Sequence, residues 1–129
     1  MNRQIIFRGK SKCNGEWLYG DLEYNRQKDI ARIHTYNKDE AYEGQEIVDA
    51  ETVCQFTGLF DKNGKEIYEG DILDVEGEAV LYVVEWHDAG LKARQVSNRS
   101  TIGLFNWNKY ITVIGNVHDN FELLKNQKP

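Results

Sequence analysis

The chain has 129 residues, of which 40% are hydrophobic and 12% aromatic. This length and composition predict a single globular domain with a buried core rather than a disordered chain. A net charge of −5 disfavours a duplex-DNA binder, because such proteins bind phosphates through clustered lysine and arginine. No apolar run approaches the ~20 residues that a membrane-spanning helix needs, and residues 1–8 lack the apolar stretch of a signal peptide. We therefore expect a cytoplasmic protein without a membrane partner.

Short strands separated by turn residues are the dominant pattern along the chain. The predicted strands span residues 5–8, 17–24, 30–36, 46–48, 53–57, 66–68, 72–75, 78–86, 91–96, 104–107 and 111–117. We expect loops at residues 37–44 and 97–103. The end of the sequence differs, because residues 119–125 predict a short helix. Asp119 or Asn120 can cap this helix, and Glu122, three residues after Asp119, has the spacing of a capping box.

Three of these segments carry the fold prediction. Along residues 17–24, Leu18 and Leu22 fall on one face and Trp17 and Tyr19 on the other, which is typical of a half-buried antiparallel strand. The pair Asn63-Gly64 tolerates positive φ and predicts a tight hairpin. The segment 78–86 is apolar on both faces, which places it in the centre of a sheet.

The cysteines and histidines predict no reactive or metal site. Cys13 and Cys54 are expected to be free thiols in a reducing cytosol, and Cys54, which lies in a predicted strand, is expected to be buried. His34, His87 and His118 are far apart in the chain and do not have the spacing of metal ligands.

An acidic group around Gly77 is a candidate for acid–base or metal chemistry; it consists of Asp71, Asp74, Glu76 and Glu78. A solvated face is the favoured interpretation, because charged residues are rarely buried without partners. The chain has no glycine-rich phosphate loop, no HExxH and no GxSxG motif, and the glycine that follows Asp61 is misplaced for an EF-hand. We therefore predict no catalytic, cofactor-binding or metal-binding residues.

Exposed aromatic side chains are the remaining candidates for binding. Trp17 and Tyr19 share a face with acidic residues, and Trp107, Lys109 and Tyr110 fall in one loop-like segment. Aromatic side chains beside lysine can stack on bases or anchor a protein partner, although most aromatic residues of a small β domain are expected in its core.

Three segments together resemble the YopX family of phage and prophage proteins. They are Phe7-Arg8-Gly9-Lys10 with Gly15-Glu16-Trp17-Leu18-Tyr19-Gly20-Asp21-Leu22, the central block of residues 51–72, and Ile114-Gly115-Asn116-Val117-His118-Asp119-Asn120-Phe121-Glu122-Leu123-Leu124. The central block, which contains Gly58-Leu59-Phe60-Asp61-Lys62-Asn63-Gly64-Lys65, is the most specific. Cys54 and Phe121 depart from the pattern, which usually has glycine and proline at these positions.

The resemblance implies a mainly β fold of small antiparallel sheets in one YopX-like domain, residues 1–129. An N-terminal β region would span about residues 1–57, and a partly closed SH3-like barrel would span about residues 58–125, ending in a short C-terminal helix. The resemblance also implies a phage or prophage origin and a cytoplasmic location in a bacterial host. It implies no activity, because the function of the family is unknown.

Our leading hypothesis is a non-catalytic phage accessory protein that binds a protein partner and could form homo-oligomers through an exposed edge strand. The first alternative is a barrel that binds single-stranded nucleic acid, with a steep dependence on salt. The second is a metal-dependent enzyme that uses the acidic group around Gly77, which would bind magnesium, manganese or calcium.

Overall fold

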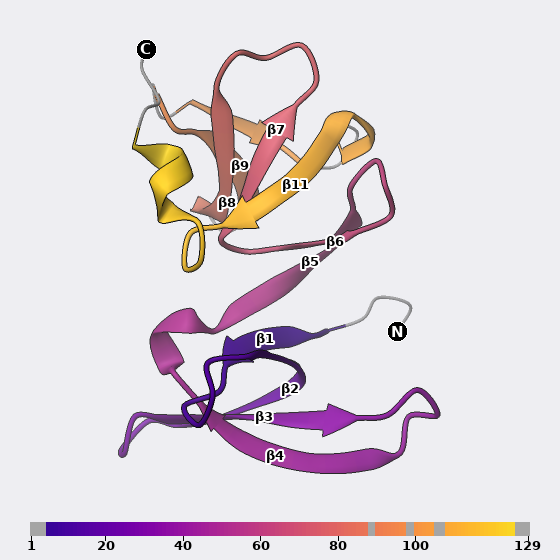
Figure 1. The fold of residues 1–129 in the computed structure, drawn as a ribbon, viewed down its shortest axis with the longest axis vertical. Helices are drawn as coiled ribbons and strands as arrows, with labels where there is room; N and C mark the ends of the chain where they lie inside the picture. The colour runs from indigo at the N-terminus through magenta and orange to yellow at the C-terminus, as the bar shows by residue number, and fades with distance from the viewer. Residues whose placement is uncertain (1–4, 88–89, 98–99, 105–107, 126–129) are drawn as a thin grey trace. The chain divides into compact units, whose positions relative to one another are not determined.

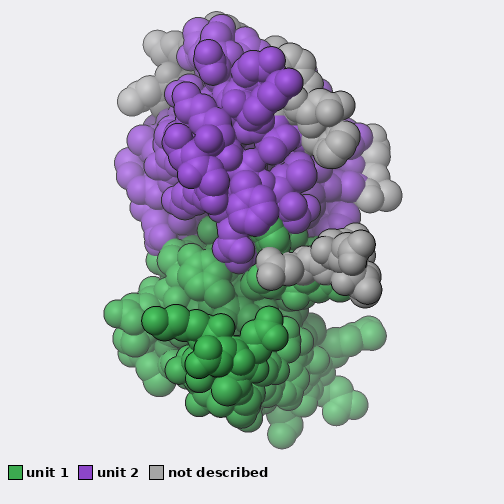
Figure 2. All heavy atoms as spheres, turned by 90° about the vertical axis from the view of Figure 1, so that its right-hand side faces the viewer, with its two compact units in different colours: residues 1–56 green, residues 57–129 purple. Residues whose placement is uncertain are grey.

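The structure, a computed structural model, describes residues 5–87, 90–97, 100–104 and 108–125. The chain divides into two compact units, residues 1–56 and residues 57–129 (Figure 2). Its described part is mainly β, with antiparallel strands in two sheets and a few short 3-10 turns, as the sequence predicts (Figure 1).

Unit 1 is built on antiparallel strands in the order β4-β3-β2-β1-β5. These strands are β1 (Phe7–Lys10), β2 (Trp17–Asn25), β3 (Ile30–Tyr36), β4 (Tyr42–Val48) and the first part of β5 (Cys54–Phe60). A 3-10 turn, η1 (Ala50–Thr52), follows β4. The expected alternation along β2 is confirmed, because Leu18 and Leu22 pack on the core while Asp21 and Glu23 are exposed.

The core of unit 1 lies on one face of this sheet. Ala31, Ile33 and Val48 are almost completely buried, and apolar residues of β1, β2 and the η1 region pack around them. Beyond the end of β1, Ser11 forms an isolated bridge with Val48, and the N–H of Lys12 donates to the carbonyl of Ile47. The last residues of β4 are therefore paired on both sides.

Unit 2 contains the rest of β5, with β6 (Glu66–Tyr68) beside it, and a five-stranded antiparallel sheet in the order β10-β9-β8-β7-β11. The strands of the second sheet are β7 (Asp71–Val75), β8 (Leu81–His87), β9 (Gly90–Gln95), β10 (Thr101–Gly103) and β11 (Ile111–Asn116). A 3-10 turn, η2 (Asn108–Tyr110), comes directly before β11. In the described residues neither sheet closes into a barrel.

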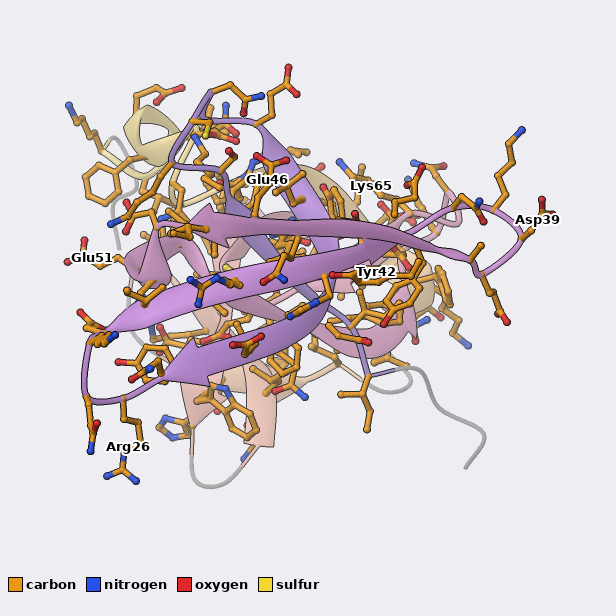
Figure 3. The ribbon with its side chains drawn as sticks, turned by 90° about the horizontal axis from the view of Figure 1, so that it is seen from below. Arg26, Asp39, Tyr42, Glu46, Glu51 and Lys65 are labelled. Atoms are coloured by element: carbon orange, nitrogen blue, oxygen red, sulfur yellow. The ribbon has the colours of Figure 1, made fainter. Side chains whose placement is uncertain are left out.

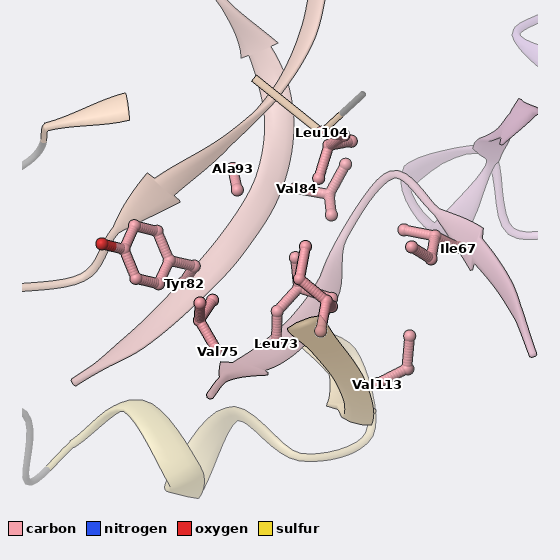
Figure 4. Packing of buried hydrophobic residues seen from close by; sticks show 9 residues of the cluster. Ile67, Leu73, Val75, Tyr82, Val84, Ala93, Leu104 and Val113 are labelled. Carbon is pink, nitrogen blue, oxygen red and sulfur yellow. The ribbon is translucent and has the colours of Figure 1, made fainter. Parts of the chain in front are cut away.

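The core of unit 2 is the larger of the two and gathers side chains from most of its strands (Figure 4). Its buried members are Ile67, Leu73, Val75, Tyr82, Val84, Ala93, Leu104, Ile111 and Val113. The predicted central strand is confirmed as β8, which lies between β7 and β9 and buries three consecutive residues, Tyr82 to Val84. Trp86 departs from that prediction, because its side chain is 52% exposed.

Two predicted loops are wrong in part. β4 begins at Tyr42, inside the predicted loop 37–44, because the side chain of Asn37 accepts the N–H groups of Asp39 and Ala41 and so closes a tight turn. β10 lies inside the predicted loop 97–103 and pairs with β9. Of the strand predicted at 104–107, Leu104 is buried outside any strand and the other residues lie outside the described part of the chain.

The predicted C-terminal capping box is also wrong. The described residues form a 3-10 turn, η3 (Phe121–Leu124), whose N-cap residue Asn120 makes no capping side-chain bond. The side chain of Asn120 instead accepts the N–H of Asn116, and the carboxylate of Asp119 accepts from the amide side chain of Asn116. Both polar side chains are therefore committed to the end of β11 and do not cap the turn.

Candidate functional site

The outward face of the unit 1 sheet carries a group of aromatic and charged side chains. The cross-strand pairs Asp21–His34 and Tyr36–Tyr42 place residues of β2, β3 and β4 side by side on this face. We call Asp21, Glu23, His34, Tyr36 and Tyr42 the tyrosine face. Tyr42 lies toward one end of the unit 1 sheet in Figure 3, and Arg26 and Glu51 lie toward the other.

His34 links the two edges of the tyrosine face. Its Nε2 lies 2.8 Å from a carboxylate oxygen of Glu23, and its Nδ1 lies 3.1 Å from the hydroxyl of Tyr42. Because a carboxylate can only accept, Nε2 donates the proton, and in the neutral ring Nδ1 accepts the O–H of Tyr42. The chain Tyr42–His34–Glu23 therefore crosses three strands and fixes the phenol of Tyr42.

Two tyrosine rings lie at the centre of this face. The rings of Tyr36 and Tyr42 are 5.6 Å apart in an edge-to-face arrangement, a geometry that aromatic quadrupoles favour. A hydrogen bond to Asp21 is the main cause that raises the pKa of Tyr36 above its ordinary value. Tyr36 is 45% exposed and Tyr42 55% exposed, so the rings are held in place while much of their surface faces outward.

A pocket on the opposite, core-bearing face of unit 1 is the second feature. It has a volume of about 470 Å³ and lies between the end of the β2–β3 hairpin and η1. Its lining consists of Leu22, Tyr24, Asp29, Ala31, Ala50, Glu51 and Val53. The hydroxyl of Tyr24 donates to the carboxylate of Asp29, and this bond is the main cause that raises the pKa of Tyr24.

The acidic group around Gly77 is not brought together as one site, and its predicted solvation is wrong for one member. Asp71 is 1% exposed, and its carboxylate accepts the N–H of Tyr68 at 2.7 Å, so it closes the turn before β7. Asp74, Glu76 and Glu78 are exposed. Among the residues that the structure describes, no three histidine, cysteine or acidic side chains are grouped so that they could hold a metal ion.

Asp61 confirms the predicted hairpin and adds a contact that the sequence does not reveal. Its carboxylate accepts the N–H groups of Asn63 and Lys65 within the turn and of Val113 in β11, at 2.8–3.0 Å. Burial would raise the pKa of Asp61, but these three donors and the charge of Lys65 lower it below its ordinary value. Asp61 is therefore a structural residue of unit 2.

As expected, Cys13 and Cys54 form no disulfide and Cys54 is buried; the structure adds that Cys13 is exposed. His87 and His118 are exposed, whereas His34 is half-buried in the tyrosine face. The sequence singles out Trp17 for its aromatic ring, and the guanidinium of Arg8 lies 4.6 Å from that ring.

The second aromatic candidate of the sequence lies on η2. The ammonium of Lys109 is 5.3 Å from the ring of Tyr110, and Trp107 is outside the described residues. The sequence therefore finds one aromatic strand of unit 1 but misses Tyr36 and Tyr42. A tyrosine at each end of the Asn37 turn is the signal that could have found them.

The family model described as YopX protein matches residues 6–125, and the chain belongs to the YopX family. In solved structures, the chain is similar to protein EF1440 from Enterococcus faecalis, with a TM-score of 0.60 and 23% sequence identity. That likeness covers 96% of this chain and 100% of the other, and it concerns the fold alone. The comparison with curated proteins finds no match. No helix in the described part of the chain is long and apolar enough to cross a bilayer.

Proposed function

We propose that this chain is a non-catalytic module that binds a protein partner through the tyrosine face. The single observation that carries the proposal is the pair of exposed, mutually packed rings of Tyr36 and Tyr42 on an open sheet face. Tyrosine is enriched at protein interfaces because it offers a large contact area with few rotatable bonds. Here the bonds to His34 and Asp21 lower the entropy cost of docking further, since both rings are already ordered.

The charges around the rings fit a polar interface rim. Glu23 contacts both His34 and, at 3.9 Å, Arg32, and Ile47 on β4 adds a 39% exposed apolar side chain. An apolar and aromatic centre surrounded by charged groups is the usual composition of a transient protein interface.

The finer fold and origin form part of the same proposal. We take unit 2 as SH3-like, because β11, the last strand of its five-stranded sheet, pairs with β7, the first strand of that sheet, and η2 comes directly before β11. The family resemblance supports a phage or prophage accessory protein that works in the cytoplasm of a bacterial host, with residues 1–129 as one YopX-like domain.

The test is affinity capture from host lysate, with nuclease-treated and untreated halves read by mass spectrometry. The baits are the unaltered chain, the double variant Tyr36→Ser/Tyr42→Ser, and Phe121→Ser as a control that removes a 58% exposed ring from η3. We expect the unaltered chain to capture one protein in both lysate halves. The Phe121→Ser control should also capture this protein, and the double variant should not. Once that protein is purified, Tyr36→Ser/Tyr42→Ser should bind it at least about 30-fold more weakly than the unaltered chain, because the variant removes two interface hot spots.

Other outcomes would replace the proposal. Equal capture by the double variant would remove the tyrosine face as the binding site. Capture that vanishes after nuclease treatment would favour the single-stranded nucleic-acid alternative, for which the cations over Trp17 and Tyr110 are the supporting observation. Binding that falls steeply with salt would then be expected.

Self-association is a separate proposal that rests on β4, an edge strand of its sheet. The bonds of Lys12 and Asp49 cover its final residues, and the edge from Tyr42 to Gln45 is the stretch a second copy could pair with. A dimer mass in light scattering would support it, and a monomer mass at working concentration would contradict it.

A further inference from the structure

The unit 1 pocket combines an apolar floor with an acidic mouth. Leu22, Ala31, Ala50 and Val53 are apolar, and Ala31 is 1% exposed. The other lining residues are Asp29 and Glu51, with the phenol of Tyr24. Asp29 and Glu51 are exposed carboxylates.

The pocket exists because small residues stand where larger ones would fill the space. Ala31 lies directly opposite Tyr24 in the β2–β3 register, so the tyrosine ring has no bulky neighbour across the strand. Ala50 begins η1, and the side chain of Asp49 fixes that turn by accepting the N–H of Glu51. The floor and one wall are therefore set by backbone pairing, which keeps the pocket open without a ligand.

The acidic groups at the mouth, Asp29 and Glu51, form no ion pair with a described side chain. The bond from Tyr24 occupies one oxygen of Asp29 and leaves its charge in place. The site therefore suits a ligand with an alkyl part for the floor and a positive charge for the mouth.

Lysine and arginine side chains have this construction, with an apolar stem and a cationic head. We propose that the pocket receives a lysine or arginine side chain of the protein partner. The net charge of −5 also favours a basic partner. This inference rests on the proposed function for the source of the side chain, but the pocket chemistry can be tested without the partner.

The test is a titration of the isotope-labelled full chain, followed by amide NMR. The probes are lysine and arginine capped by Nα-acetyl and methylamide groups, and equally capped norleucine, which keeps the alkyl stem and lacks the cation. We expect the lysine and arginine probes to shift the amides of Ala31, Ala50 and Val53, with dissociation constants on the order of tens of millimolar, as ligands of this size allow. Norleucine should bind at least about threefold more weakly.

A charge-matched pair of variants makes the test specific. Asp29→Asn/Glu51→Gln should weaken the lysine probe about tenfold, or about threefold for each carboxylate. Asp39→Asn/Glu43→Gln removes as much charge from the β3–β4 side of unit 1 and should leave binding unchanged. The asparagine at position 29 can still accept the Tyr24 hydroxyl, so the pocket wall is preserved.

Several results would overturn the inference: equal binding of norleucine, shifts outside the pocket, equal affinity of the two double variants, or no shift at saturating probe. Tighter binding of butane-1,4-diamine than of capped lysine would also overturn it, since the ligand would then be a free polyamine. These results are independent of the capture experiment. If the titration shows no binding in the pocket, loss of capture by Tyr36→Ser/Tyr42→Ser would still support the tyrosine face. If the capture experiment fails, the titration still tests the pocket.

Discussion

Replacing Asp61 should destabilise unit 2 far more than an ordinary surface substitution. In Asp61→Ala the N–H of buried Val113 loses its acceptor, which costs about 1–3 kcal/mol. The N–H groups of Asn63 and Lys65 lie in exposed residues and can bond to water instead, so each adds less. We expect a total loss of about 2–4 kcal/mol in the free energy of unfolding.

The contribution of Asp61 to the free energy of unfolding depends on pH through the charge of its carboxylate. The pKa of Asp61 in the folded protein is lowered, so its ionised form stabilises the fold at any pH above the unfolded-state pKa of about 3.9. That contribution is lost as the pH falls through the folded pKa. Asp61→Asn should therefore be less stable than the unaltered chain at pH 7, and the difference should shrink on acidification.

Urea unfolding followed by circular dichroism at several pH values measures this difference. Amide exchange at Val113 gives a local readout, which should accelerate in both variants. Asp74→Asn, an exposed carboxylate of the same unit, is the control and should stay within about 0.5 kcal/mol. A loss of that small size for Asp61→Ala, or a stability gap that widens toward acid, would refute the reasoning.

Two further predictions concern unit 1. A Cβ added at Gly20 would lie 2.0 Å from the backbone oxygen of His34, whereas the three nearest atoms to one at Gly9 all belong to the side chain of Val48, the first at 2.8 Å. Gly20→Ala should therefore cost about 3 kcal/mol and Gly9→Ala about 1 kcal/mol, and thermal melting that ranks them in reverse would contradict this. A thiol reagent should modify Cys13 rapidly in the native protein and Cys54 only after unfolding, because Cys54 is buried; equal rates by mass spectrometry would be evidence against it.

Sequence patterns predict strands well where burial alternates, and they fail where side chains redirect the backbone. β3 has the predicted bounds because its β-branched and aromatic residues fit a pleated strand. β4 begins earlier than predicted because Asn37 shortens the turn before it. β10 is three residues long, and a strand of that length shows no measurable alternation.

The candidate sites depend on register, which a single sequence does not reveal. The pairing of Tyr36 with Tyr42 spans a turn and an irregularity in the β3–β4 ladder, so spacing alone would not place the two rings together. For Asp71 the sequence makes the opposite error: it groups residues that the structure separates. Its position beside other acidic residues suggests that they share one surface. Its carboxylate instead accepts the N–H of Tyr68. This local side-chain-to-backbone bond keeps the carboxylate away from the surface.

The bond from Val113 to Asp61 joins residues that are 52 positions apart, and this separation bears on the nascent chain. A ribosome releases the Asp61 hairpin and β7 well before β11, the strand that pairs with β7 and supplies the Val113 donor. Until then β7 keeps an open edge, and the entropy of closing so long a loop opposes early pairing. β11 therefore completes the β7 edge only after the strands between them have been synthesised, and until then the chain exposes a strand edge that other molecules could occupy.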